Sequence, residues 1–156
     1  MAPISQTDTD FEVNASLVKP PFSDEDLARL DGLQSVLVWA NFARSGLTDQ
    51  GIAPLGTFDR ITKLRLDNTE LGDGAVDTLL SLPSLEWLNM YGTKLTDAGL
   101  ARLAAHPGLT RLYCGESNVT AAGVLEARKG REGLMIVGPE PPAPAPPAGE
   151  DQPEAD

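Results

Sequence analysis

The chain has 156 residues, 41% hydrophobic and 22% charged, which suits one folded domain. Twelve basic residues against 23 acidic ones give a net charge of −11, which argues against a nucleic-acid or anionic-membrane partner. A single cysteine and a single histidine exclude an internal disulfide and a histidine-rich metal site, and no run of about 18 apolar residues predicts a membrane span.

The N-terminal segment, residues 1–10, is polar, with two acids and no base, and is predicted to be disordered. It has neither the basic residues nor the apolar run of a signal peptide, so we expect a cytoplasmic protein. A periplasmic or cell-envelope location would follow if the chain is a fragment of a larger exported protein.

The next segment, residues 11–36, is predicted to be an imperfect first repeat. Its strand should lie within residues 11–18, and its helix within FSDEDLARL at residues 22–30. That phrase matches LTDAGLARL at residues 95–103, but one residue out of phase. An alternative register starts the following repeat at Leu33 and turns Val36 and Val38 inward, and the sequence leaves both registers open.

From residue 37 onward, the sequence repeats every 24 residues without gaps, in four copies that start at residues 37, 61, 85 and 109. Five positions of the repeat are apolar in every copy. Positions 1, 4, 6, 11 and 16 hold, in turn, Leu37, Ile61, Leu85, Leu109; Ala40, Leu64, Leu88, Leu112; Phe42, Leu66, Met90, Cys114; Leu47, Leu71, Leu95, Val119; and Ile52, Val76, Leu100, Val124.

Each repeat changes its apolar period from that of a strand to that of a helix. Positions 4 and 6 alternate, which predicts strands centred near residues 39, 64, 88 and 112, whereas positions 16 and 19 are three apart and predict a helix. Glycine at position 15 of most copies indicates a close approach of the helix to its neighbour. A serine or threonine hydroxyl at position 9 can bond a free backbone group where the strand ends. A final strand is expected at residues 134–137.

The pattern LxxLxL, followed by a small polar residue and a further leucine, resembles the leucine-rich repeat. The phrase LTDAGL at residues 95–100 is similar to the ribonuclease-inhibitor-like class, and NMYGTKLTDAGL and VTAAGV resemble bacterial repeat segments attached to c-type cytochrome proteins. The resemblance implies an α/β fold over residues 11–138: a right-handed solenoid with a parallel sheet on the concave side and helices on the convex side. The chain has no CxxCH motif for haem, and it uses Ser and Thr at position 9 where the family usually has Asn or Cys.

The C-terminal segment, residues 139–156, holds seven of the 13 prolines and five acids, with no base. It has no apolar residue larger than alanine, so it is predicted to be disordered, with polyproline II stretches. A spacer or a solvated end is the preferred interpretation, ahead of a ligand for an SH3-like groove.

Candidate binding residues come from positions 3, 5 and 7, which should point away from the core because strand side chains alternate between faces. Both tryptophans and both tyrosines occupy these positions, and Trp, Tyr and Arg are enriched in binding hot spots. The alternative is that the aromatic rings only cover the sheet. The candidates are Trp39, Asn41, Lys63, Arg65, Trp87, Asn89, Tyr91, Arg111 and Tyr113.

Other polar residues are given structural roles. Asp49, Asp73 and Asp97 are interpreted as charges that favour helix N-termini. Cys114 should be buried and inert, and His106 should be a partly packed surface residue. Because no catalytic dyad, phosphate loop or set of metal ligands is visible, we expect no enzymatic activity, no cofactor and no metal.

The sequence therefore predicts a monomeric, non-catalytic module that binds a protein on its concave face. The cations Lys63, Arg65 and Arg111 should pair with acidic groups around an apolar knob of that partner. Two alternatives are kept: an accessory domain of a bacterial electron-transfer protein, and a substrate-recruiting adaptor.

Overall fold

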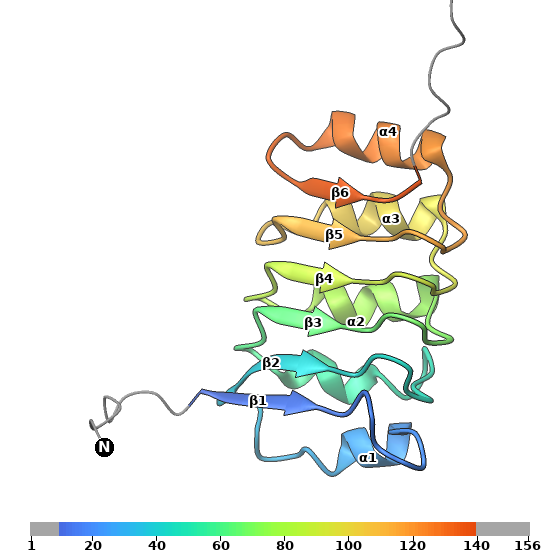
Figure 1. Ribbon diagram of the computed structural model, residues 1–156. Helices are drawn as coiled ribbons and strands as arrows, with labels where there is room; N and C mark the ends of the chain where they lie inside the picture. Colours follow the sequence, from blue (N-terminus) through green and yellow to red (C-terminus); the bar gives the residue numbers. More distant parts are fainter. Residues whose placement is uncertain (1–9, 140–156) are drawn as a thin grey trace, which may run out of the picture.

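The computed structural model describes residues 10–139, so the expectations for residues 1–9 and 140–156 lie outside the described part. Six strands form one parallel sheet, in which the strand order is the chain order (Figure 1). The strands are β1 (Phe11–Asn14), β2 (Leu37–Asn41), β3 (Lys63–Arg65), β4 (Trp87–Asn89), β5 (Arg111–Tyr113) and β6 (Met135–Val137). The expected α/β class and the expected strand positions are confirmed.

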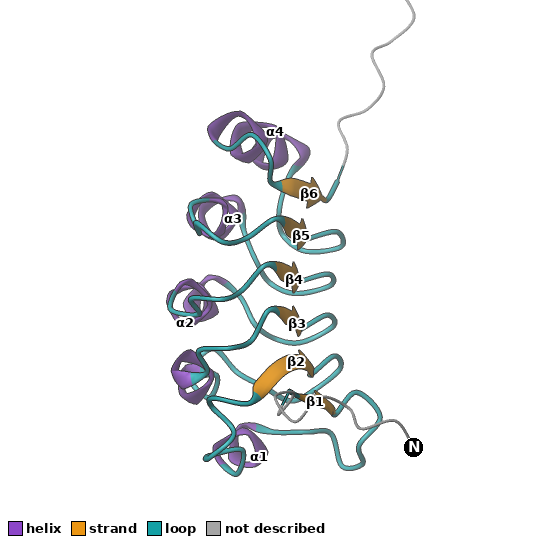
Figure 2. Cartoon of the chain, turned by 90° about the vertical axis from the view of Figure 1, so that its left-hand side faces the viewer, coloured by secondary structure: helices purple, strands orange, loops and turns teal. Residues whose placement is uncertain are grey.

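The helices form a second layer on one side of the sheet, and the turns that follow the strands lie on the other side (Figure 2). Successive helices pack against one another along this layer, as the strands do in the sheet. The helices are α1 (Asp24–Ala28), the 3-10 helices η1 (Ala53–Thr57) and η2 (Asp73–Ala75), α2 (Val76–Leu80), α3 (Asp97–Ala104) and α4 (Ala121–Gly130). Within residues 10–139, none of them has the length and apolar character to cross a membrane.

The strand register follows the 24-residue period of the sequence. From β2 to β6, Trp39 pairs with Lys63, Lys63 with Trp87, Trp87 with Arg111 and Arg111 with Met135. The first strand departs from this period, because Glu12 pairs with Trp39 and the register shifts between Phe11 and Glu12. The extra residues in this first connection account for the out-of-phase match of residues 22–30.

The core lies between the two layers and is built around the five repeated apolar columns. Of the twenty residues in those columns, all have zero exposure except Val119, at 6%. The alternative register is wrong, because Leu37 is fully buried whereas Val36 and Val38 are only partly buried. Adjacent side chains on a strand point to opposite faces, so the burial of Ala40 turns the neighbouring Trp39 to the outer face.

One expected α-helix is replaced by a 3-10 helix, η1, in the unit that starts at residue 37. Its apolar side chains, Ile52 and Leu55, are buried as their spacing predicts. Pro54 has no backbone N–H to donate, and Gly56 is a poor helix former. These two residues disfavour an α-helix in this segment.

The turns after the strands share a left-handed residue at position 8 of the repeat. Arg44, Asn68 and Glu116 have φ values of 59°, 58° and 52°, and Gly92 has 66°. The backbone N–H groups of Arg44, Asn68 and Gly92 donate to the next turn, for example from Asn68 to the carbonyl of Tyr91 at 2.7 Å. These bonds continue the sheet ladder beyond the strands. They stabilise this conformation at Arg44 and Asn68, which are not glycines.

The hydroxyl at position 9 acts as expected in three of four copies. Thr69, Thr93 and Ser117 donate their side-chain hydroxyls to the carbonyls three residues earlier, at 2.7, 2.7 and 2.5 Å. The fourth hydroxyl, of Ser45, is buried and has no hydrogen-bond partner among the described residues.

The aspartates at the helix starts connect neighbouring units. Asp73 accepts the backbone N–H of Thr96 at 2.9 Å and its hydroxyl at 2.5 Å. Asp97 binds Thr120 in the same way, at 2.7 and 2.6 Å.

The predicted first-turn position holds for Asp73 and Asp97. It is wrong for Asp49, which precedes η1 and accepts the backbone N–H of Gly72 at 2.8 Å. All three aspartates also bind the residue that precedes the next helix. Gly99 leaves room for the carboxylate of Asp73, because a Cβ atom at residue 99 would lie 2.3 Å from Asp73 Oδ1.

The expectation for His106 is wrong, because this residue is 1% exposed. Its Nε2 lies 2.7 Å from the carbonyl oxygen of Leu82, and its Nδ1 accepts the backbone N–H of Gly108 at 3.1 Å. The neutral imidazole with the proton on Nε2 satisfies both bonds. The same position holds Phe58 and Leu82 in earlier units, so the ring fills a core site while also bonding the loop.

Cys114 is fully buried on the inner face of β5, as predicted. Burial raises the pKa of its thiol to about 11, because the thiolate would lose its hydration. The unfolded thiol ionises at about 8.5, so above this pH the unfolded state loses its proton first and the folded state is disfavoured. The contribution of the buried, protonated thiol to the free energy of unfolding is fully present below about pH 8.5 and is lost as the pH rises towards 11.

This ionisation gives a measurable pH dependence. Between pH 8 and pH 10, the free energy of unfolding should fall by about 2 kcal/mol more in the natural chain than in a Cys114→Ala variant. Urea denaturation of both proteins at the two pH values measures the difference, and the variant corrects for the lysines and tyrosines. Equal slopes in the two proteins would contradict a buried, protonated thiol.

Candidate binding face

The outer face of the sheet carries all nine candidate residues. We call it the outward face and define it as the side chains at positions 3, 5 and 7 of strands β1 to β6 and of the turns that follow them. Because the strands are parallel and in register, residues at the same position form rows across the sheet. The geometry of the face therefore repeats strand by strand, and only the residue types change.

The row at position 3 alternates rings with cations. Across β2 to β5 it reads Trp39, Lys63, Trp87 and Arg111. The two indoles are partly buried, whereas the two cations are exposed. The side chains of Lys63 and Arg111 make no ion pair or hydrogen bond within residues 10–139. Their charges are therefore available to a ligand.

The aromatic residues of β4 and β5 form a connected surface. The ring centroids of Trp87 and Tyr113 lie 5.3 Å apart at an interplanar angle of 50°. Tyr91 is 44% exposed, and its ring lies over Gly115, where a Cβ atom would be only 3.1 Å from two ring carbons. Glycine at this position therefore lets the tyrosine ring approach the backbone of the next turn closely.

The apolar surface continues onto β6, which sequence reasoning did not include. Met135 is 54% exposed and pairs with Arg111, and Val137 is 42% exposed and pairs with Tyr113. Continuing the 24-residue period by one more step would have found both. We call Trp87, Tyr91, Tyr113, Met135 and Val137 the apolar patch.

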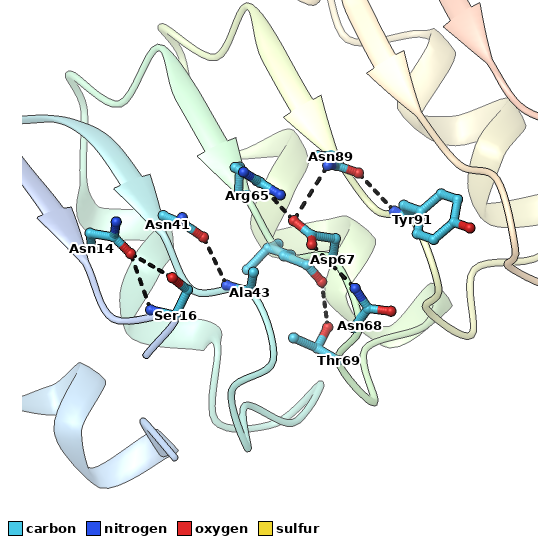
Figure 3. A network of polar contacts seen from close by, with 11 residues as sticks. Asn14, Ser16, Asn41, Ala43, Arg65, Asp67, Asn68, Thr69, Asn89 and Tyr91 are labelled. Carbon is cyan, nitrogen blue, oxygen red and sulfur yellow. Dashed lines mark hydrogen bonds and ion pairs between the residues drawn. The ribbon is translucent and has the colours of Figure 1, made fainter. Parts of the chain in front are cut away.

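Asp67 is the centre of a polar network beside the apolar patch (Figure 3). It is 7% exposed, and its Oδ1 accepts from Arg65 Nε at 2.9 Å and from Asn89 Nδ2 at 3.3 Å. Asn68 Nδ2 donates to Oδ2 at 3.3 Å. The guanidinium of Arg65 therefore already has an acidic partner within the chain, so the expectation that it pairs with a partner protein's acids is not supported.

The asparagines at position 5 bond the backbone rather than face outward freely (Figure 3). Asn41 Oδ1 accepts the N–H of Ala43 at 3.1 Å, and Asn89 Oδ1 accepts the N–H of Tyr91 at 2.9 Å. Asn14 makes the same bond to Ser16 at 3.2 Å. Asn41 is only 5% exposed, so its assignment as a binding residue is the weakest of the nine.

The helix layer has a separate feature, an open groove of about 480 Å³ between α3 and α4. Small residues line most of it, and its two acids are Asp97 and Glu126. No cluster of three or more His, Cys, Asp or Glu side chains that could hold a metal ion occurs in the described residues. Unlike the outward face, this groove is lined by no aromatic ring and no cation.

No model of a known protein family matches the chain, and no curated protein sequence matches it either.

Proposed function

We propose that the chain is a leucine-rich repeat protein of the ribonuclease-inhibitor-like class, wound as a right-handed solenoid. Two features support this: the 24-residue register from β2 to β6, and the apolar columns buried at every step. Right-handed crossovers are nearly universal between parallel strands of one sheet. In such a solenoid, the outward face is the concave side of the sheet.

The function that the outward face supports best is non-catalytic binding of a protein partner. The observation that carries this proposal is the apolar patch, which combines the Trp87–Tyr113 ring pair with the exposed side chains of Tyr91, Met135 and Val137. Exposed apolar side chains that adjoin on a regular sheet cost free energy in water unless a ligand covers them. Tryptophan and tyrosine bind proteins well because they bury large areas with few rotatable bonds.

The charges around the patch define the complementary partner. Lys63 and Arg111 lie beside Trp87 in the position-3 row and have no acidic partner in the described chain. A partner with an apolar knob and neighbouring carboxylates would cover the rings and pair with both cations. Arg65 is left out of this set because Asp67 holds it.

Affinity capture with the full chain tests the proposal. A variant carrying Trp87→Ala and Tyr91→Ala should retain at least tenfold less of any specifically captured protein, because losing a central aromatic costs about 2 kcal/mol or more. Captured proteins are compared by quantitative mass spectrometry.

The matched control is Leu125→Ala on helix α4, in the other layer. The leucine side chain is 41% exposed, close to the 44% of Tyr91. Both variants must have the unfolding transition of the natural chain. If the Leu125 variant loses the captured protein and the aromatic variant keeps it, binding occurs through the helices and the proposal is wrong.

A further inference from the structure

We infer that the outward face binds residues 140–156 of its own chain, so that this segment competes with an external partner for the apolar patch. This inference rests on the proposed function, since it takes the outward face to be a protein-binding surface. Three observations point to this occupant: where the segment leaves the fold, the spacing of its prolines, and its charge.

The segment follows the last strand of the face it would cover. It follows β6, whose outward side chains Met135 and Val137 belong to the apolar patch. In a polyproline II conformation, residues 140–147 span about 25 Å, whereas the four strand spacings from β6 to β2 amount to about 19 Å. The segment is therefore long enough to cross the whole row at position 3.

The proline spacing matches the spacing of the apolar row. Pro141, Pro144 and Pro147 are three residues apart, so in a polyproline II helix they would share one face and repeat about every 9.3 Å. Apolar side chains at position 3 occur on every second strand, at Trp39, Trp87 and Met135, which is a repeat of about 9.6 Å.

The two repeats agree closely enough for successive prolines to contact successive apolar residues. Proline-rich segments dock on aromatic-lined grooves in this way.

The charges of the segment and the face are complementary. The segment contains Glu140, Glu150, Asp151, Glu154 and Asp156 and no basic residue. Glu140 directly precedes the stretch 141–147 that would lie on the row, and the other four acids follow it. The cations of the row, Lys63 and Arg111, have no partner in the described chain, so Glu140 would be attracted towards Arg111 and the following acids towards Lys63. The groove between α3 and α4 offers the opposite environment, because Asp97 and Glu126 line it and would repel the same acids.

Attachment to the same chain makes weak docking effective. A segment tethered this close to its site acts at an effective concentration of about a millimolar or more. A partner must displace it, so only ligands that bind the patch better than the tethered prolines would be retained.

Paramagnetic relaxation in the full chain tests this inference. A nitroxide label is attached at Ala148→Cys, and mass spectrometry verifies that the buried Cys114 has not reacted. The readout is the indole N–H signal of Trp87, assigned by comparison with a Trp39→Phe variant, because the chain has two tryptophans. This signal should lose at least half of its intensity and recover when the label is reduced. Backbone amide signals of helix α2, in the other layer, should keep theirs.

The charge argument has its own variant. Lys63→Glu combined with Arg111→Glu leaves the core untouched and should restore most of the Trp87 intensity. If the Trp87 signal is unaffected by the label in the natural sequence, the inference is wrong. It is also wrong if the loss appears only when ¹⁵N-labelled chains are mixed with separate spin-labelled chains, since the segment then binds a second copy.

The two proposals can fail independently. In one case, the label reduces the Trp87 signal, but the Trp87→Ala, Tyr91→Ala variant captures as much partner as the natural chain. That result would overturn the proposed function and support the docking of residues 140–156. An unaffected Trp87 signal, together with capture that depends on Trp87 and Tyr91, would overturn the docking inference alone.

Discussion

Replacing Leu88 with alanine should lower the free energy of unfolding by about 2–5 kcal/mol, the usual cost of truncating a fully buried leucine. Leu88 has zero exposure and lies in the middle of the sheet, where it pairs with Leu64 on one side and Leu112 on the other. Both neighbouring strands are held in register, so the cavity cannot close by local collapse. A domain of this size has only about 5–15 kcal/mol of stability, so much of the total would be lost.

Urea denaturation followed by circular dichroism measures this effect. The control is Leu125→Ala on α4, where the leucine is 41% exposed and the change should stay within about 0.5 kcal/mol. A loss below that value for Leu88→Ala would place the residue at the surface and contradict the strand register.

Replacing Gly99 with alanine should cost about 2–4 kcal/mol, although alanine is ordinarily the better helix residue. The new Cβ would lie 2.3 Å from Asp73 Oδ1 and 2.7 Å from Leu95 Cδ1. The carboxylate would have to leave, and with it the two bonds that it accepts from Thr96. The variant therefore tests the aspartate link between neighbouring units.

The control for this substitution is Gly130→Ala in α4, where a Cβ would meet nothing within 4 Å. That change should be neutral or slightly stabilising. Adding Asp73→Ala to Gly99→Ala should cost less than the sum of the two single changes, because the clash is then absent. Additive costs in denaturation experiments would show that Gly99 and Asp73 do not interact.

The sequence predicts the core and the strands well because burial acts on a repeated pattern. A residue such as Leu64 must be apolar to lie between layers, and its counterparts 24 residues away meet the same requirement. The register of the first unit is different, because it has no second copy to compare. Leu37 is buried and Val36 and Val38 are only partly buried because β2 pairs with β3 in the regular 24-residue register.

Polar interactions on the face are much harder to predict. Arg65 and Asp67 are two residues apart on one strand, a spacing that is common in any charged segment, so the sequence alone does not show that they bond. The third member, Asn89, comes from the next strand. The burial of His106, in the core, is equally hard to predict. Its ring bonds the carbonyl of Leu82, 24 residues earlier, and the sequence pattern does not identify that partner.

The candidate face could be predicted by position but not by accessibility. Alternation along the strands places Trp87 and Tyr113 outward, and their contact follows from the register. Whether a residue such as Asn41 is exposed depends on the turn it bonds, which the alternation does not describe. Met135 was missed because the last strand was identified from its apolar run and was not aligned with the preceding repeats.

Chemical-shift mapping of the captured partner on the isotope-labelled full chain tests the central claim, that binding uses the outward face. The account predicts that a saturating partner shifts the indole N–H signal of Trp87 and the amide signals of β4, β5 and β6, while α2 and α3 are unchanged. Shifts confined to the helix layer, with the Trp87 indole signal unmoved, would contradict it.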